Sequence, residues 1–191
     1  ARPATGAGDP SLRYSGFVWA GDRVVYATQE TNGSTGVSTS LYAVEPGARA
    51  VRVFTEEGYA PFFLYPTRDG SRVSYLGSVA GSAGFLLGSV DLDSGARVVH
   101  GRGQPFYSAW SPDGDGLVIH VGAPGSSAGS VLGIQALGDG SELASARRLQ
   151  LSAGSFQAPD FSPDGSRIAV VLRRDGSAGV HILTAEGQEL G

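Results

Sequence analysis

The turn sequence Ser111-Pro112-Asp113-Gly114 lies between an aromatic-rich stretch and a β-branched run, and Ser162-Pro163-Asp164-Gly165 repeats it. A degraded copy occurs at Thr67-Arg68-Asp69-Gly70, and a weaker one at Gly21-Asp22. In the complete copies proline presets φ, aspartate can bond its own backbone, and glycine accepts a positive φ. The glycines of the four copies, Gly21, Gly70, Gly114 and Gly165, are 49, 44 and 51 residues apart. A period in the forties made of strands and turns is typical of propeller blades.

Two further turn series keep nearly the same spacing. Serine-glycine loops end at Gly36, Gly84, Gly129 and Gly179, and tight turns end at Gly47, Gly95, Gly140 and Gly187. Three turns in each period join four strands, so the sequence predicts an all-β fold: a β-propeller of about four consecutive four-stranded blades. The expected repeats are about 14–58, 59–103, 104–156 and 157–191, after a leader or linker at 1–13.

The sequence allows two arrangements of the blades. The last repeat ends just after its third turn, so its outer strand is missing from the sequence given. The chain is therefore either a closed four-bladed ring or, the solution we favour, a fragment of a larger propeller.

Composition narrows the possible functions. All 14 basic residues are arginine, and cysteine is absent, which excludes a Schiff-base lysine, a phosphate-loop lysine and a thiol nucleophile. The net charge of -4, with scattered arginines, argues against a nucleic-acid partner. No apolar run approaches the ~20 residues that a membrane-spanning helix needs, so we expect no membrane span.

An aromatic residue precedes the first turn of three repeats, at Trp110, Phe161 and, by alignment, Trp19. We expect these rings to be wedges packed between adjacent blades and not platforms for a ligand.

The motif of an aromatic residue, Ser-Pro-Asp-Gly and a β-branched strand, at 110–118 and 161–168, resembles the WD40-like propeller repeat of the TolB type. The resemblance covers about residues 14–191 and includes the Ser89–Gly95 turn region. It implies a propeller scaffold of the kind found in periplasmic TolB, in propellers that precede prolyl-oligopeptidase catalytic domains, and in extracytoplasmic lipoproteins and sensor ectodomains. No partner-binding residue follows from it, because the motif is the scaffold.

Several patterns that suggest chemistry have simpler explanations. Ser127 lies in a GxSxG match, but this loop joins two strands and is not the strand-to-helix turn of a nucleophile elbow. The three histidines, His100, His120 and His181, fall in different repeats or layers, so neither a triad nor a three-histidine metal site is expected. Asp91-Leu92-Asp93-Ser94-Gly95 lacks the spacing of a calcium loop, and Glu56-Glu57 is interpreted as a solvated loop. We expect no enzyme activity, no cofactor and no metal.

Loops that enter inner strands line one mouth of a propeller. The polar and aromatic residues expected there are Tyr59, Gln104, Tyr107, Gln157 and Asp160. The leading hypothesis is a non-catalytic periplasmic or extracellular module that binds or scaffolds another protein. The alternative is the gating propeller of a serine peptidase whose catalytic domain is not in this chain.

Overall fold

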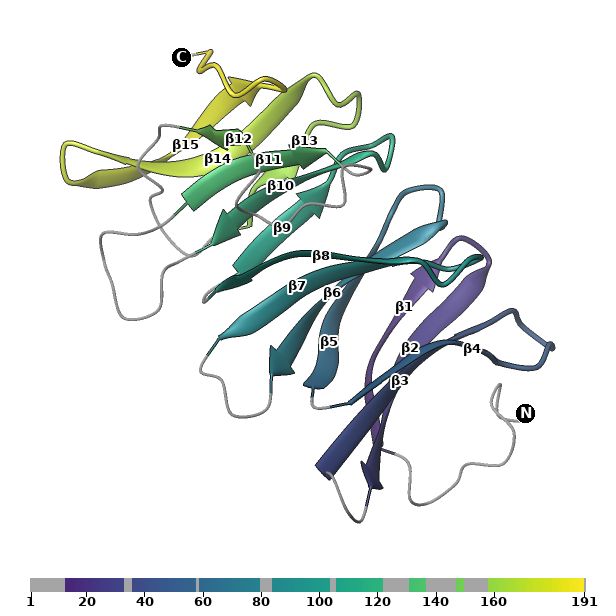
Figure 1. The fold of residues 1–191 in the computed structure, drawn as a ribbon. Coiled ribbons are helices and arrows are strands. Elements are labelled where there is room, and N and C mark those ends of the chain that lie inside the picture. The colour runs from purple at the N-terminus through teal and green to yellow at the C-terminus, as the bar shows by residue number, and fades with distance from the viewer. Residues whose placement is uncertain are drawn as a thin grey trace. The chain divides into compact units, whose positions relative to one another are not determined.

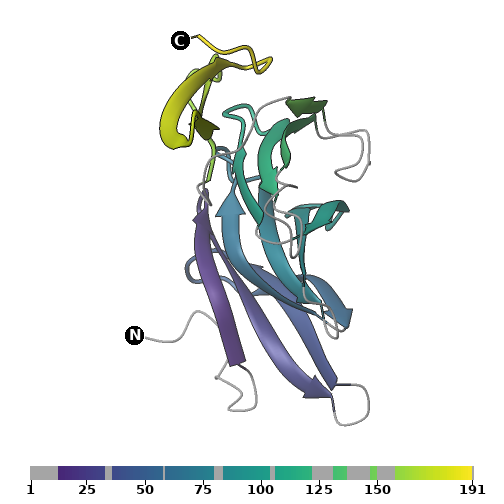
Figure 2. The same ribbon diagram turned by 90° about the vertical axis from the view of Figure 1, so that its left-hand side faces the viewer.

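The structure, a computed structural model, describes residues 13–32, 36–57, 59–79, 84–103, 106–121, 131–136, 147–149 and 158–190. These residues form strands and turns and no helix, which confirms the all-β prediction. The strands make four separate sheets, each with its strands side by side in chain order (Figures 1 and 2).

The first sheet holds β1 (Arg13–Ala20), β2 (Arg23–Asn32), β3 (Gly36–Val44) and β4 (Val51–Glu57). The second holds β5 (Tyr59–Pro66), β6 (Arg72–Val79), β7 (Phe85–Asp91) and β8 (Arg97–Gly103). The third holds β9 (Phe106–Trp110), β10 (Gly116–Val121), β11 (Val131–Ala136) and β12 (Arg147–Leu149). The fourth holds β13 (Asp160–Phe161), β14 (Arg167–Arg174) and β15 (Ser177–Thr184). The predicted four blades are thus present, and the described part of the last has three strands.

The chain divides into two compact units, residues 1–82 with 86–98, and residues 83–85 with 99–191. The first unit contains the first sheet and most of the second. The second unit contains the third and fourth sheets.

Three of the repeated turns have the same hydrogen-bond network. In the first of them, the Asp69 carboxylate accepts the Thr67 hydroxyl at 2.6 Å and the Ser71 backbone N–H at 3.0 Å. The Thr67 hydroxyl oxygen then accepts the Arg72 N–H at 3.0 Å, and the Gly70 N–H closes the turn on the Thr67 carbonyl. The corresponding bonds recur around Asp113 and Asp164. The glycines that end these turns have positive φ, as predicted.

These bonds stabilise the ionised carboxylates. Hydrogen bonds from Thr67 and Ser71 hold the pKa of Asp69 below its ordinary value, and bonds from Ser111 and the Asp115 amide do the same to the pKa of Asp113. The Ser162 hydroxyl, with the amide and hydroxyl of Ser166, lowers the pKa of Asp164 to about 2. The aspartates of the motif therefore act as turn anchors.

Within the first unit, the buried face of the first sheet packs on the second. Val25, Ala27 and Leu41 have no exposed surface, and the Phe54 ring lies 5.5 Å from the ring of Tyr75 on β6. The turns of the two sheets also approach closely, because a Cβ added at Gly70 would lie 2.3 Å from the Gly21 nitrogen.

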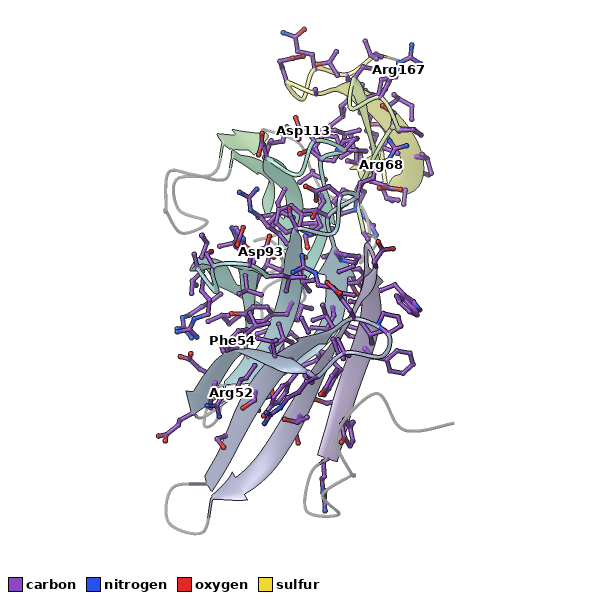
Figure 3. The ribbon with its side chains drawn as sticks, turned by 90° about the vertical axis from the view of Figure 1, so that its right-hand side faces the viewer. Arg52, Phe54, Arg68, Asp93, Asp113 and Arg167 are labelled. Atoms are coloured by element: carbon purple, nitrogen blue, oxygen red, sulfur yellow. The ribbon has the colours of Figure 1, made fainter. Side chains whose placement is uncertain are left out.

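Two arginines also join these sheets. Arg23 on β2 forms an ion pair with Asp93 at 2.6 Å and donates to the Gly70 carbonyl at 3.2 Å. Arg97 on β8 pairs with Glu56 on β4 and lies over the Phe54 ring, 5.0 Å from its centroid. Phe54 and Asp93 therefore mark the aromatic and the ionic contact between the sheets (Figure 3).

Within the second unit, β14 packs on the third sheet. Val118 from β10 and Ile168, Val170, Leu172 and Leu183 form a buried cluster, against which Phe161 packs. This confirms the predicted packing role of Phe161.

The same prediction is wrong for Trp19, which is 59% exposed. Trp19 pairs with Val24 across β1 and β2, so its ring lies on the face of the first sheet opposite to Val25 and Leu41. No described sheet in the first unit covers that face.

Candidate functional site

The strongest candidate for a binding element is a bulge in the inner strand β5. The antiparallel register between β5 and β6 shifts between Phe62, which pairs with Leu76, and Leu64, which pairs with Tyr75. Phe63 is the extra residue, and its φ is 50°. A bulky residue at positive φ is a steric outlier, because its Cβ approaches the following carbonyl oxygen.

The first sheet has the same bulge and occupies it differently. Phe17 pairs with Tyr26 directly after a register shift, as Leu64 pairs with Tyr75. Gly16 therefore corresponds to Phe63, and its φ is 82°. The first and second sheets share this positive φ, whereas the third pairs β9 with β10 without a register shift. The first sheet has glycine at the bulge and the second has phenylalanine, although only glycine adopts a positive φ without strain.

The strained residue faces solvent. Phe63 is 61% exposed, and Tyr65, two residues further along β5, is 49% exposed. The half-buried Phe62 ring meets the Phe63 ring edge to face at 5.2 Å. Leu64, which lies between Phe63 and Tyr65, is buried. A Cβ added at Gly16 of β1 would touch the Leu64 side chain. Packing of Phe62 and Leu64 thus fixes the backbone that presents the two exposed rings.

The structure describes three of the five predicted mouth residues. Tyr59 begins β5 in the first unit, whereas Tyr107 in β9 and Asp160 in β13 belong to the second. Gln104 and Gln157 lie outside the described residues. Strands β9 and β13 are in contact, so the structure brings the strands of Tyr107 and Asp160 together. Asp160 is exposed, while Tyr107 is half-buried with its ring 6.2 Å from that of His120.

The candidate chemical groups that the structure describes are either buried or hydrogen-bonded. His100 and His120 are buried, and His181 on β15 contacts Glu189 at 2.7 Å. Asp91 accepts the Ser94 amide and hydroxyl, as a turn residue does. Ser127 lies outside the described residues. Among the residues that are described, no group of three or more His, Asp or Glu could hold a metal ion, and no helix could cross a membrane.

Phe63 is not among the mouth residues that the sequence predicts. Alignment of the first two repeats through Gly21 and Gly70 puts Gly16 opposite Tyr65 and not opposite Phe63, because the turn between Pro66 and Val73 is two residues longer than the turn between Trp19 and Val24. Periodicity alone treats Phe62 to Tyr65 as an uninterrupted strand.

Comparison with known proteins supports the fold. No protein-family model and no curated protein matches the sequence. Among solved structures, TolB from Acinetobacter baumannii is similar with a TM-score of 0.56 and 23% identity over 93% of this chain and 43% of that one. The β-propeller domain of the Trilobed protease from Pyrococcus furiosus has a TM-score of 0.64 and 13% identity over 93% of this chain and 56% of that one.

A prolyl endopeptidase is also similar, with a TM-score of 0.61 and 14% identity over 91% of this chain and 26% of that one. The chain spans about half or less of the length of these solved chains. At these identities the likeness concerns the fold. In agreement with its turn motif, the chain has the fold of a TolB-type β-propeller.

Proposed function

We propose that this chain is a non-catalytic propeller module that binds another protein, with Phe63 and Tyr65 of β5 as its anchors. The observation that supports this most strongly is the positive φ of Phe63 at a position where the first sheet has glycine. Backbone strain of this kind persists only where the surrounding structure imposes it, and it is common at binding sites. Bulges also re-aim side chains next to functional sites.

The chemistry of the two side chains suits a protein partner. Exposed aromatic rings on a strand of fixed geometry lose little conformational entropy on binding, and aromatic residues are enriched in interface cores. By analogy with the TolB-type propellers it resembles, we place the module in the periplasm or outside the cell.

The test uses immobilised protein and an envelope extract of the source organism. We expect a polypeptide retained by the wild type to be lost from the Phe63→Gly variant and kept by Val51→Ala. Val51 is a suitable control because it is 66% exposed and belongs to β4 of the first sheet, whereas the bulge is in β5 of the second. Equal retention by Phe63→Gly and the wild type, with both folded, would contradict the proposal.

A second candidate is the gating propeller of a serine peptidase. It is supported by the likeness to the protease propeller and the prolyl endopeptidase, whose TM-scores exceed that of TolB. Sequencing the full reading frame separates the two. An adjoining α/β-hydrolase domain would support the peptidase, and an upstream lipobox or membrane anchor would support the binding module.

A further inference from the structure

The same tetrapeptide forms two different turns in this chain. Arg-Asp-Gly-Ser occurs at 68–71 and again at 174–177. Both aspartates, Asp69 and Asp175, are exposed to solvent, and the glycine after each has a positive φ. The two copies therefore agree in sequence and in solvent access, and they differ in backbone conformation and hydrogen bonding.

The first copy belongs to the repeated turn with the hydrogen-bond network. The Asp69 carboxylate accepts the Thr67 hydroxyl at 2.6 Å, the Ser71 N–H at 3.0 Å and the Ser71 hydroxyl at 2.9 Å. The Gly70 N–H donates to the Thr67 carbonyl at 3.0 Å, and Gly70 itself is buried. The carboxylate and the nitrogen that follows it are thus both held in place.

The second copy connects β14 to β15 in a two-residue hairpin loop. Arg174 pairs with Ser177, and Asp175 and Gly176 between them have φ values of 50° and 83°, the combination of a type I′ turn. Among the described residues, none donates a hydrogen bond to the Asp175 carboxylate and none accepts one from the Gly176 N–H. A Cβ added at Gly176 would meet nothing within 4 Å. The carboxylate and the nitrogen are therefore free to approach each other.

An aspartate that precedes glycine can close a five-membered ring on its own backbone. The nitrogen of the glycine attacks the side-chain carboxyl carbon of the neutral acid, so a C–N bond forms, the C–OH bond breaks, and the hydroxyl leaves as water with the proton of the N–H. Water then opens the succinimide at either carbonyl, which gives back aspartate or yields isoaspartate, whose backbone runs through the side chain. Glycine favours ring closure because it has no Cβ to hinder a close approach.

We propose that Asp175 is a site of spontaneous isomerisation to isoaspartate, and that the hydrogen-bond network of the repeated turn protects Asp69 from the same reaction. Ring closure at Asp69 must break the bonds to its carboxylate and release the Gly70 N–H. The same bonds favour the ionised carboxylate, as the lowered pKa of Asp69 indicates, whereas ring closure needs the neutral acid.

The other Asp-Gly pairs of the described chain have their glycine nitrogens engaged. Each nitrogen donates to the carbonyl or hydroxyl oxygen of the serine that opens its turn, in Asp113-Gly114, Asp115-Gly116 and Asp164-Gly165. Asp175-Gly176 differs because its hairpin closes between Arg174 and Ser177 and leaves both central residues outside the ladder.

Isomerisation should weaken the hairpin that contains Asp175. It adds one methylene to the backbone of a loop whose length sets the register of the two strands. Strands β14 and β15 contribute Leu172 and Leu183 to the buried cluster of the second unit. We therefore expect the isoaspartate form to unfold at a lower urea concentration than the aspartate form.

The test compares the two copies of the tetrapeptide within one molecule. The folded chain is kept at about pH 5, where an aspartate of ordinary pKa near 4 is partly neutral. Peptide mapping with electron-transfer fragmentation then distinguishes isoaspartate from aspartate at each site. We expect isoaspartate to accumulate at Asp175 at least about 10-fold faster than at Asp69, since one hydrogen bond to a charged group contributes about a factor of ten. In the urea-unfolded chain the two copies should react at nearly the same rate.

Two variants assign the effect to these groups. Asp175→Glu, which would need a six-membered ring, should remove the product at position 175 alone. Thr67→Val removes one bond to the Asp69 carboxylate and should speed the reaction at Asp69 while leaving Asp175 unchanged, with circular dichroism as the check on folding. Equal rates at the two sites in the folded wild type would overturn the proposal. So would the same ratio of rates in the folded and unfolded chains, or no isoaspartate at Asp175 in a folded chain whose unfolded form produces it.

Discussion

The left-handed backbone of Phe63 predicts an inverted order of glycine and alanine stabilities at this position. Alanine and glycine both remove the ring, so the difference between Phe63→Gly and Phe63→Ala isolates the backbone. A left-handed conformation costs a residue with a Cβ about 1–2 kcal/mol. Glycine in a strand loses about 0.5–1 kcal/mol through the entropy of its unfolded chain. We therefore expect Phe63→Gly to be more stable than Phe63→Ala by roughly 0.5–1 kcal/mol.

Tyr65 is the matched control, because it lies in the same strand and is exposed but has no positive φ. There the order should be the ordinary one, with alanine more stable than glycine by about 0.5–1 kcal/mol. The measurement is urea unfolding of the four variants, followed by circular dichroism. If alanine were the better residue at both positions, Phe63 would not be held in the left-handed region, and the argument from strain would fail.

Three further results are expected. Gly70→Ala should destabilise the chain by more than about 2 kcal/mol in thermal unfolding, because the added Cβ would meet the Gly21 backbone. Gly47→Ala is the control, since Gly47 also has a positive φ but has open space around it, and it should cost only the conformational ~1–2 kcal/mol. Phe161→Ala should lower the free energy of unfolding by about 2 kcal/mol, which is less than the 3–5 kcal/mol expected for a fully buried ring. Trp19→Ala should lower it by less than about 0.5 kcal/mol. Urea midpoints compare the two variants, and equal losses would contradict the assigned burial. The pKa of Asp164 is lowered to about 2 in the folded state, so the stabilisation from its carboxylate is present above the unfolded pKa near 4 and is lost as the pH falls toward 2. Asp164→Asn should therefore flatten the fall in unfolding free energy over this pH range. An unchanged slope would argue against the turn network.

The sequence predicted the scaffold well because its strongest signals are local. Proline, aspartate and glycine at fixed places in a turn have conformational preferences that do not depend on the rest of the fold. The hydrogen bonds to Asp69, Asp113 and Asp164 follow directly from those preferences.

The functional surfaces were harder to predict, because exposure depends on which sheets meet. Trp19 and Phe161 hold corresponding positions, yet only Phe161 has a preceding sheet to pack on within the described part of its unit. The bulge at Phe63 needs the cross-strand register, which periodicity does not give. All five predicted mouth residues remain predictions. Within the second unit, the strands of Tyr107 and Asp160 are in contact.

Site-specific photo-crosslinking tests the central claim, that Phe63 and Tyr65 contact a protein partner, most directly. Benzoylphenylalanine would replace Phe63, Tyr65 or, as the control, Val51, and each protein would be irradiated in an envelope extract of the source organism. The account predicts that positions 63 and 65 crosslink to the same polypeptide and that position 51 does not. No adduct at positions 63 and 65, or the same adducts at position 51, would contradict it.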